Sequence, residues 1–155
     1  MNLIKFNKLH LTEVMEWFPN EESISIWGGL NFRFPYSAQS FMIDLDLSNT
    51  ESFVLINDLG STLAFGQYYR RNERCHLSRL VVSPFERGNG VGKHLIAQLS
   101  LQGRNDLKVG SCSLFVMTYN KLAMKLYLSL DFRKTIYPSE IGNDMVYMVW
   151  TSDSN

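Results

Sequence analysis

The segment SPFERGNGVGKH, Ser83–His94, places glycines at positions 88, 90 and 92, directly before an amphipathic run. Glycine reaches positive φ and lets a ligand approach the backbone closely. The free amides and the dipole at the start of a helix favour anions. The segment therefore predicts a strand-to-helix turn that binds a diphosphate without a metal. A glycine-rich turn with no ligand is the structural alternative.

Two familiar nucleotide motifs do not fit this segment. A P-loop requires G-x-x-x-x-G-K-[ST], but Arg87 occupies its first glycine position and His94 the position of its Mg²⁺-binding hydroxyl. The dinucleotide fingerprint G-x-G-x-x-G would need glycine in place of Lys93. That fingerprint also belongs early in a parallel β-α-β unit. Neither a P-loop nor a dinucleotide fold is therefore expected.

The elements around the turn follow from hydrophobic spacing and from turn residues. Three strand-like runs precede it at residues 51–58, 61–71 and 75–83, with turns near DLGS and RNER, which favours an antiparallel meander. An amphipathic helix follows over residues 91–102. The remaining C-terminal elements are a strand, a helix with leucines at four-residue spacing, and two more strands, over residues 110–118, 120–130, 131–137 and 144–151.

The N-terminal third is less regular. Residues 2–6 predict a strand, and Thr12 suits the N-cap of a helix over residues 13–18 that Pro19 terminates. Residues 20–37 lack a clear period, and Ser37 suits the cap of a helix beginning at residue 38. Together the elements predict an α+β fold, with a mostly antiparallel sheet, about four helices and one β-α-β crossover. A chain of 155 residues is expected to form one domain, 1–155.

Composition excludes several classes of function. Fifteen basic and fifteen acidic residues cancel, so nothing indicates general nucleic-acid binding, and the four arginines at 70, 71, 74 and 79 are expected at solvated strand ends. No run of about 18 apolar residues indicates a membrane span, and the N-terminus lacks a signal-peptide core. Cys75 and Cys112 are too few and too isolated for a disulfide framework or a zinc site. Free buried thiols in the cytoplasm are the expected outcome.

Two motifs resemble the GNAT family of N-acetyltransferases. The stretch LSRLVVSPFERGNGVGKHLI resembles the family's [RQ]-x-x-G-x-[GA] motif, which Arg87, Gly90 and Gly92 fill. Downstream, NKLAMKLYLSLDF resembles N-x-x-A-x-x-L-Y-x-x-x-G-F, with Asn120 and Tyr127 in register. The resemblance spans roughly residues 77–103 and 113–132. Asp131 replaces the usual glycine, and it tolerates the left-handed conformation better than most residues.

The resemblance implies a site for acetyl-coenzyme A (acetyl-CoA) where two neighbouring parallel strands separate. Backbone groups of Leu80, Val81 and Val82 would contact the pantetheine arm, with Asn120 beside it and Tyr127 near the sulfur. The pyrophosphate would bind the backbone amides of Arg87, Gly88, Asn89, Gly90, Val91 and Gly92. A tyrosine hydroxyl is a suitable general acid for the leaving thiolate, so Tyr127 is the expected catalytic residue. No metal is expected.

The general base and the acceptor site are less clear. Ser78 stands near the position where many family members carry a glutamate, so His76, or water leading to bulk solvent, would take the amine proton. Residues 20–36 are expected to hold the acceptor. There Glu21 and Glu22 could attract a cation while Trp27, Phe32, Phe34 and Tyr36 pack on it. Solvated acids and core aromatics are the structural alternative.

By this resemblance the chain is expected to transfer an acetyl group from acetyl-CoA to a primary amine of a small molecule, peptide or protein. The amine would attack directly in a ternary complex. A coenzyme A-binding sensor without turnover is the main alternative, because the usual carboxylate is absent. A structural domain with a vestigial cleft is the third. The family's final strands often pair chains, which leaves a homodimer open.

Overall fold

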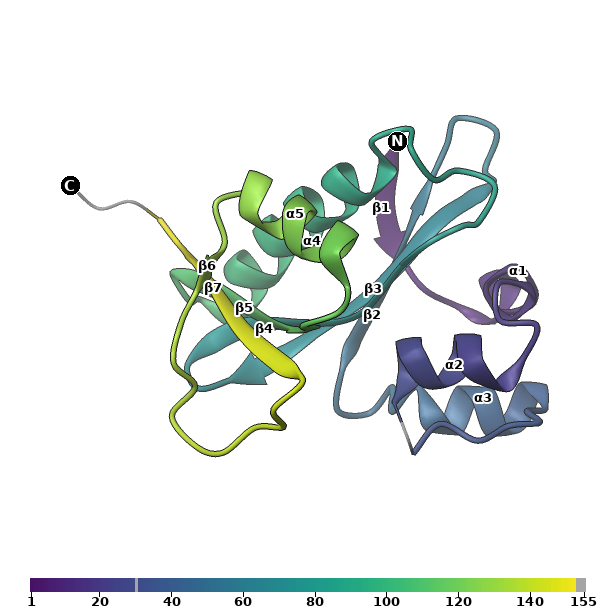
Figure 1. The fold of residues 1–155 in the computed structure, drawn as a ribbon. Helices are drawn as coiled ribbons and strands as arrows, with labels where there is room; N and C mark the ends of the chain where they lie inside the picture. The colour runs from purple at the N-terminus through teal and green to yellow at the C-terminus, as the bar shows by residue number, and fades with distance from the viewer. Residues whose placement is uncertain (30, 153–155) are drawn as a thin grey trace.

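The computed structural model describes residues 1–29 and 31–152. A seven-stranded sheet in the order β1-β2-β3-β4-β5-β7-β6 forms its centre (Figure 1). The strands are β1 (Asn2–Lys5), β2 (Glu51–Ile56), β3 (Thr62–Arg71), β4 (Arg74–Val82), β5 (Ser111–Met117), β6 (Arg133–Lys134) and β7 (Met145–Thr151). All neighbours are antiparallel except β4 and β5. The predicted α+β fold, with its antiparallel meander and single parallel crossover, is confirmed.

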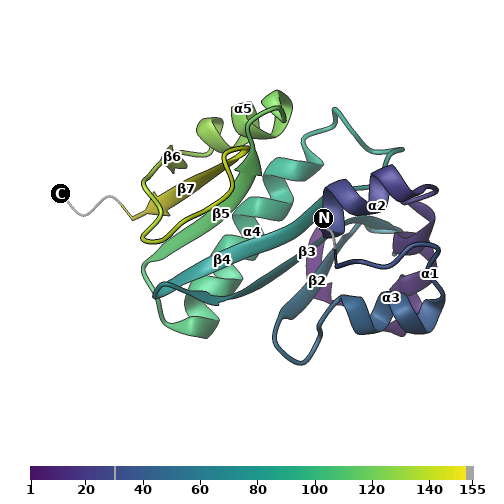
Figure 2. The same cartoon turned by 60° about the horizontal axis from the view of Figure 1, so that its bottom comes forward.

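Within residues 1–29 and 31–152, five helices cover the two faces of the sheet. They are α1 (Lys8–Glu16), α2 (Glu21–Gly28), α3 (Ala38–Asp44), α4 (Val91–Leu107) and α5 (Lys121–Ser129). Alternate residues of the strands divide the core. Phe53 and Leu77 pack in the cluster beneath α4 and α5, while Val54 and Phe65 pack with α1, α2 and α3. Figures 1 and 2 show these two helical layers on opposite sides of β3 and β4.

The first helix begins earlier than predicted. Asn7, not Thr12, is its N-cap, because the Asn7 side chain accepts a hydrogen bond from the Leu9 amide and His10 Nδ1 accepts one from the Asn7 amide. A histidine in place of the usual Glu or Gln hides this capping box from a motif search. Thr12 therefore lies inside α1.

Residues 20–37 were predicted to be irregular, but they contain α2, which makes five helices rather than about four. Asn20 caps α2 by accepting from the Ser23 amide at 2.8 Å. The alternation in SISIW hides the helical period, because Ile24 is buried whereas Ile26 is 57 % exposed. Trp27 holds the helix in place by stacking on Phe18 with ring centroids 4.2 Å apart.

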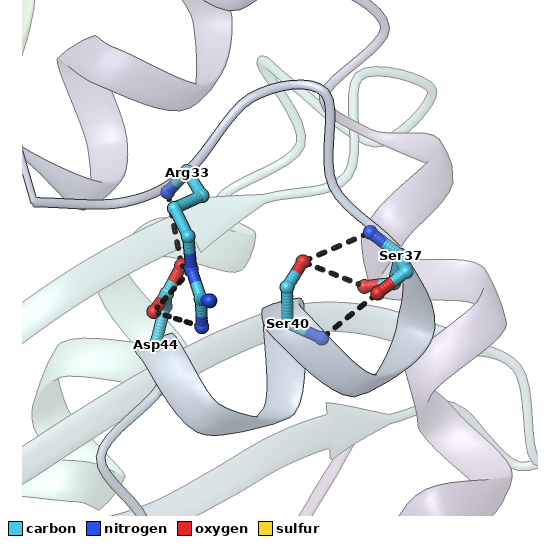
Figure 3. Close-up of polar contacts among 4 residues, drawn as sticks. All are labelled: Arg33, Ser37, Ser40 and Asp44. Carbon is cyan, nitrogen blue, oxygen red and sulfur yellow. Dashed lines mark hydrogen bonds and ion pairs between the residues drawn. The ribbon is translucent and has the colours of Figure 1, made fainter.

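The predicted cap of α3 is confirmed. Ser37 accepts a hydrogen bond from the Ser40 amide at 3.0 Å, and Ser40 Oγ accepts one from the Ser37 amide at 2.9 Å (Figure 3). Arg33 forms an ion pair with Asp44, with Nη2 and Oδ1 3.0 Å apart, and its own amide donates to the same carboxylate. These contacts anchor the segment before α3 to the end of that helix.

Later elements differ from prediction mainly in length. Helix α4 continues five residues beyond 102 and ends at Leu107, whereas β6 has only two residues of the predicted 131–137. Asp131 has φ of 68°, the left-handed conformation expected of it. In the segments that the structure describes, no helix has the length and apolar character needed to span a bilayer.

The two cysteines are adjacent in space, although they were expected to be isolated. Cys75 of β4 and Cys112 of β5 are partners in the parallel ladder, and both thiols are free and fully buried. The expectation of free buried thiols is confirmed, but the sequence separation concealed their contact.

Candidate active site

A β-bulge at Arg79 bends β4. Between Gln67↔Ser78 and Phe65↔Val81, β4 carries one residue more than β3, and Arg79 has φ of 48°. Such an extra residue bends its strand and increases the local twist. Trp27 Nε1 donates to the Arg79 carbonyl at 2.8 Å, and Arg79 Nη1 donates to the Leu45 carbonyl at 3.1 Å. The bulge is thus held by groups from α2 and from the end of α3.

Arg79 was expected among solvated strand ends, and this expectation is wrong. Its guanidinium donates to Gln67 Oε1 at 3.2 Å and lies 5.4 Å from the centre of the Phe32 ring. Burial lowers the pKa of Arg79, an effect that the carboxylates of Asp46 and Asp44 oppose. This arginine is itself part of the lining of the cleft.

Strands β4 and β5 separate after His76, ahead of the bulge at Arg79. Their parallel pairing comprises only Cys75↔Cys112 and His76↔Ser113, and Figure 2 shows the two strands diverging from that end. A cleft of about 650 Å³ occupies the opening. Its lining includes β4 from Leu77 to Val82, β5 from Leu114 to Met117, and the predicted residues Arg87, Asn120 and Tyr127. The structure thus brings Leu80, Val81 and Val82 together with the two downstream residues.

The glycine turn lies between β4 and α4. Gly88 and Gly90 have φ of 83° and 77°, and a Cβ at either position would meet no atom within 4 Å. Glycine is therefore required there by conformation rather than by space. Gly90 is the N-cap of α4 and makes no side-chain capping bond. The first amides of α4 thus lack a side-chain partner, which suits a helix start that accepts an anion.

Tyr127 projects from α5 into the cleft lining. Its ring is partly buried against the central core and lies 6.2 Å from the Phe132 ring. Burial raises the pKa of Tyr127 to about 12, so the hydroxyl carries its proton at neutral pH. A protonated hydroxyl in a cleft can donate a proton to a leaving group.

Asn120 has a structural role that the sequence motif did not reveal. It is the N-cap of α5, and its Oδ1 accepts a hydrogen bond from the Ala123 amide at 3.2 Å. The residue also lines the cleft. Capping leaves the Nδ2 donors available, so Asn120 can cap α5 and contact a ligand at once.

His76 does not line the cleft, so the structure disfavours it as the general base. Its side chain is 2 % exposed, its Nδ1 lies 2.8 Å from Ser113 Oγ, and its ring packs edge-on against Phe115. Burial, with a smaller effect from Arg71, lowers the pKa of His76 to about 4. It is a neutral core histidine at physiological pH.

The predicted acceptor segment contributes only in part. Ser23, Ile26 and Trp27 of α2 line the cleft. Glu21 and Glu22 lie exposed in the first turn of α2 and are not among the lining residues, while Phe32 is buried. Glu21 and Glu22 are therefore solvated acids and Phe32 is a core aromatic, rather than parts of an acceptor site.

Sequence reasoning missed a second, polar hollow beside the cleft. It measures about 360 Å³ and adjoins the cleft through Ser78 and Arg79. Its other lining residues are Asp46, Asn49, Thr50 and Tyr69. Asn49 Nδ2 donates to Asp46 Oδ1 at 2.8 Å, and Asp46 has φ of 55°. The loop and the strands that line this hollow are far apart in the sequence, so no local pattern could have identified it.

A helix start without a side-chain cap lies beside a cleft between splayed parallel strands. Such an arrangement suits a phosphate-bearing ligand whose other end lies in the cleft. The sequence model of the acetyltransferase (GNAT) family matches residues 11–132. The chain therefore belongs to the GNAT family and is an N-acetyltransferase.

Solved structures share the fold over almost the whole chain. A spermidine N-acetyltransferase from Vibrio cholerae, in complex with CoA and spermine, has a TM-score of 0.76 and 17% identity, covering 97% of this chain and 94% of that one. A putative acetyltransferase from Acinetobacter baylyi has a TM-score of 0.71 and 17% identity, with 99% and 94% covered. The ribosomal-protein-S18-alanine N-acetyltransferase from Escherichia coli has a TM-score of 0.67 and 21% identity, with 97% and 92% covered. At these identities the likeness concerns the fold alone.

Proposed function

We propose that this chain transfers an acetyl group from acetyl-CoA to a primary amine by direct attack within a ternary complex. One observation carries the proposal: the opening between β4 and β5 has Tyr127 in its lining and the uncapped glycine turn of α4 beside it. Acetyl-CoA has a pyrophosphate for the turn and a narrow thioester arm for the opening.

The amides of Arg87–Gly92 would bind the pyrophosphate, with the Arg87 side chain adding positive charge. Beyond His76 the edge of β4 that faces β5 has no ladder partner, so backbone groups of Leu80–Val82 can pair with the amides of pantetheine. Asn120 would contact the same arm. These roles need no metal.

The chemistry requires few protein groups. The neutral amine attacks the thioester carbonyl, a carbon–nitrogen bond forms, and an oxyanion develops that a backbone amide can stabilise. The carbon–sulfur bond then breaks, Tyr127 gives its proton to the departing thiolate, and the tyrosinate regains a proton from solvent. The amine loses its proton through water, since none of the described residues that line the cleft is Asp, Glu or His.

The polar hollow supports an amine acceptor. The Asp46 carboxylate can attract a cationic part of the acceptor, and Ser78 lies where the hollow meets the cleft. Solved structures of the same fold include a spermidine N-acetyltransferase and a ribosomal-protein-S18-alanine N-acetyltransferase. Both substrates present a primary amine, and we place this chain's acceptor in the same broad class. The cytoplasmic location and the homodimer stay predictions.

A CoA-binding sensor without turnover is the second candidate, because the cleft lining has Ser78 near the position where many family members carry a glutamate. It predicts the same ligand affinity as the enzyme but no thiol release. A measurement of turnover therefore distinguishes the two candidates, whereas a measurement of binding does not.

The first experiment measures thermal unfolding with acetyl-CoA, CoA or ATP–Mg²⁺. A ligand at 100 times its dissociation constant stabilises by about 2.7 kcal/mol, which raises the midpoint by roughly 5–10 °C in a domain of this size. A rise with acetyl-CoA and not with ATP–Mg²⁺ supports the site, and thiol release with spermidine or an alanine-terminated peptide then supports the enzyme. No rise at saturating acetyl-CoA contradicts both candidates.

A further inference from the structure

The polar hollow of about 360 Å³ beside the cleft is lined by side chains that all carry a polar group. The residues are Asp46, Asn49 and Thr50 from the segment after α3, and Tyr69, Ser78 and Arg79 from β3 and β4. Covering such walls with an apolar ligand would leave their polar groups without partners, which is costly. The part of a ligand that occupies the hollow is therefore polar on most sides.

Asp46 supplies the negative charge of the hollow. Its side chain is exposed, and its Oδ1 accepts a hydrogen bond from Asn49 Nδ2 at 2.8 Å. Within residues 1–29 and 31–152 no basic side chain forms an ion pair with it, whereas the nearby Asp44 is paired with Arg33. The Asp46 carboxylate is thus available to an ammonium group of a ligand.

Arg79 supplies the positive charge. Its Nη1 donates to the Leu45 carbonyl at 3.1 Å and to Gln67 Oε1 at 3.2 Å, which uses both hydrogens of that nitrogen. The Leu45 carbonyl also accepts from the Thr50 hydroxyl at 3.4 Å, so the guanidinium lies against the Thr50 wall of the hollow. In the described part of the chain, Nε and Nη2 of Arg79 have no hydrogen-bond partner.

The unpaired edge of Arg79 has the shape that binds a carboxylate. Nε and Nη2 lie on one side of a guanidinium and can donate two parallel hydrogen bonds to the two oxygens of one carboxylate. Arg33 uses this same edge on Asp44, with Nε 3.1 Å from Oδ2 and Nη2 3.0 Å from Oδ1 (Figure 3). Arg79 therefore offers to a ligand the contact that Arg33 makes within the chain.

The two charges together favour a zwitterion. A ligand with cationic groups alone would bring one of them toward Arg79, which repels it. An α-amino acid carries an ammonium and a carboxylate on one carbon, so it satisfies Asp46 and Arg79 together. The Tyr69 hydroxyl accepts from Arg71 Nη1 at 2.9 Å and keeps its own proton for a ligand oxygen.

We propose that the acceptor is a free α-amino acid with a second, terminal amine on its side chain, the class of L-ornithine and L-lysine. This inference rests on the proposed acetyl transfer and names its substrate. The carboxylate binds Nε and Nη2 of Arg79, and the α-ammonium binds Asp46. The side chain passes Ser78, which lines both the hollow and the cleft, and brings the terminal amine to the thioester.

This placement determines which nitrogen reacts. The α-amine stays protonated beside Asp46 and has no lone pair for attack. The terminal amine loses a proton to water and forms the carbon–nitrogen bond, the carbon–sulfur bond breaks, and Tyr127 protonates the thiolate. The products are CoA and an amino acid acetylated on its terminal nitrogen.

The test compares acceptors that differ by one charged group. Cadaverine is L-lysine without the carboxylate, putrescine is L-ornithine without it, and Nα-acetyl-lysine lacks the α-ammonium. In at least one pair, kcat/KM from thiol release should be about tenfold or more higher for the diamino acid than for the diamine. Nα-acetyl-lysine should fall below L-lysine by a similar factor, and fragmentation in a mass spectrometer should place the acetyl group on the terminal nitrogen. Diamines that are equal or better, or acetylation of the α-nitrogen, would overturn the proposal.

Variants locate the two charges. Asp46→Asn keeps the shape of the side chain and suits the φ of 55°, and it should abolish the preference for L-lysine over Nα-acetyl-lysine. Arg79→Gln should abolish the preference for L-lysine over cadaverine. Asp58→Asn, an exposed acid-to-amide change in the turn between β2 and β3, should keep both preferences.

Each preference is a ratio within one variant, so a general loss of activity does not imitate the expected result. Preferences that persist in Asp46→Asn and Arg79→Gln overturn the assignment. If Arg79→Gln fails to fold, Asp46→Asn and the cadaverine comparison decide.

Failure of the acetyl transfer itself gives a different result. If spermidine or an alanine-terminated peptide is acetylated and no diamino acid is, the transfer stands and the zwitterionic acceptor is overturned. If no amine releases thiol, the transfer fails, and calorimetric titration of L-lysine and cadaverine, with and without CoA, still tests the hollow. Tighter binding of L-lysine supports the assignment of the hollow, and equal or tighter binding of cadaverine contradicts it.

Discussion

The Tyr127 hydroxyl is the group on which turnover is expected to depend. Tyr127→Phe removes the proton donor and keeps the ring that packs on the core. We expect turnover to fall by about 10²-fold or more, whereas stabilisation by acetyl-CoA stays at the wild-type value. Because burial raises the pKa of Tyr127 to about 12, this group should cause no loss of activity up to about pH 10. Steady-state thiol release measures both effects, and a fully active variant would refute the acid role.

His76 should make stability depend on pH. Its pKa is about 4 in the folded chain and about 6.5 when unfolded, so the unfolded chain takes up the proton first as the pH falls. Its contribution to stability is therefore complete above pH 6.5 and declines as the pH falls toward 4. Urea unfolding at pH 7.5 and 4.5 should show that His76→Gln loses roughly 2–3 kcal/mol less than wild type between these values. The exposed His94→Gln serves as the control and should lose as much as wild type.

At the scale of elements, the bulge in β4 requires a left-handed residue. Arg79 has φ of 48°, a conformation that costs an L-residue with a Cβ roughly 1–2 kcal/mol. Arg79→Gly and Arg79→Ala both lose the guanidinium contacts, so both should be less stable than wild type. The glycine variant should nevertheless be the more stable of the two by about 1 kcal/mol, measured by urea unfolding. In a regular strand the order is reversed, and a reversed order here would show that the bulge is absent.

At the scale of the whole molecule, the cleft is lined by the α2 layer on one side and the α5 layer on the other. Bound acetyl-CoA would contact both, so hydrogen exchange should slow in residues 78–92 and 114–127 and in α2. The pairing of β1 with β2 lies outside the cleft lining and should exchange as before. ATP–Mg²⁺ is the control ligand. Uniform protection along the chain, or protection by both ligands, would contradict the assigned site.

Local sequence patterns correctly predicted the caps and turns that depend on only a few neighbouring residues. The cap at Ser37 depends on Ser40, and the turn before α4 depends on glycines that reach positive φ. The helix α2 was missed because the alternation of serine and isoleucine in SISI, with Ile24 buried and Ile26 exposed, hides the helical period. Its place is determined by the stacking of Trp27 on Phe18 and Phe41. Propensity is a weak guide when distant packing decides an element.

The amino-acid sequence by itself determined the succession of strands along the chain, the single crossover and the glycine turn, because these follow from spacing, alternation and φ. The tertiary structure alone decided the opening after His76↔Ser113, the burial of His76 and the contact of Cys75 with Cys112. Each of these depends on residues that are far apart in the sequence. Their burial and their contacts are defined only when the helical layers pack on the sheet.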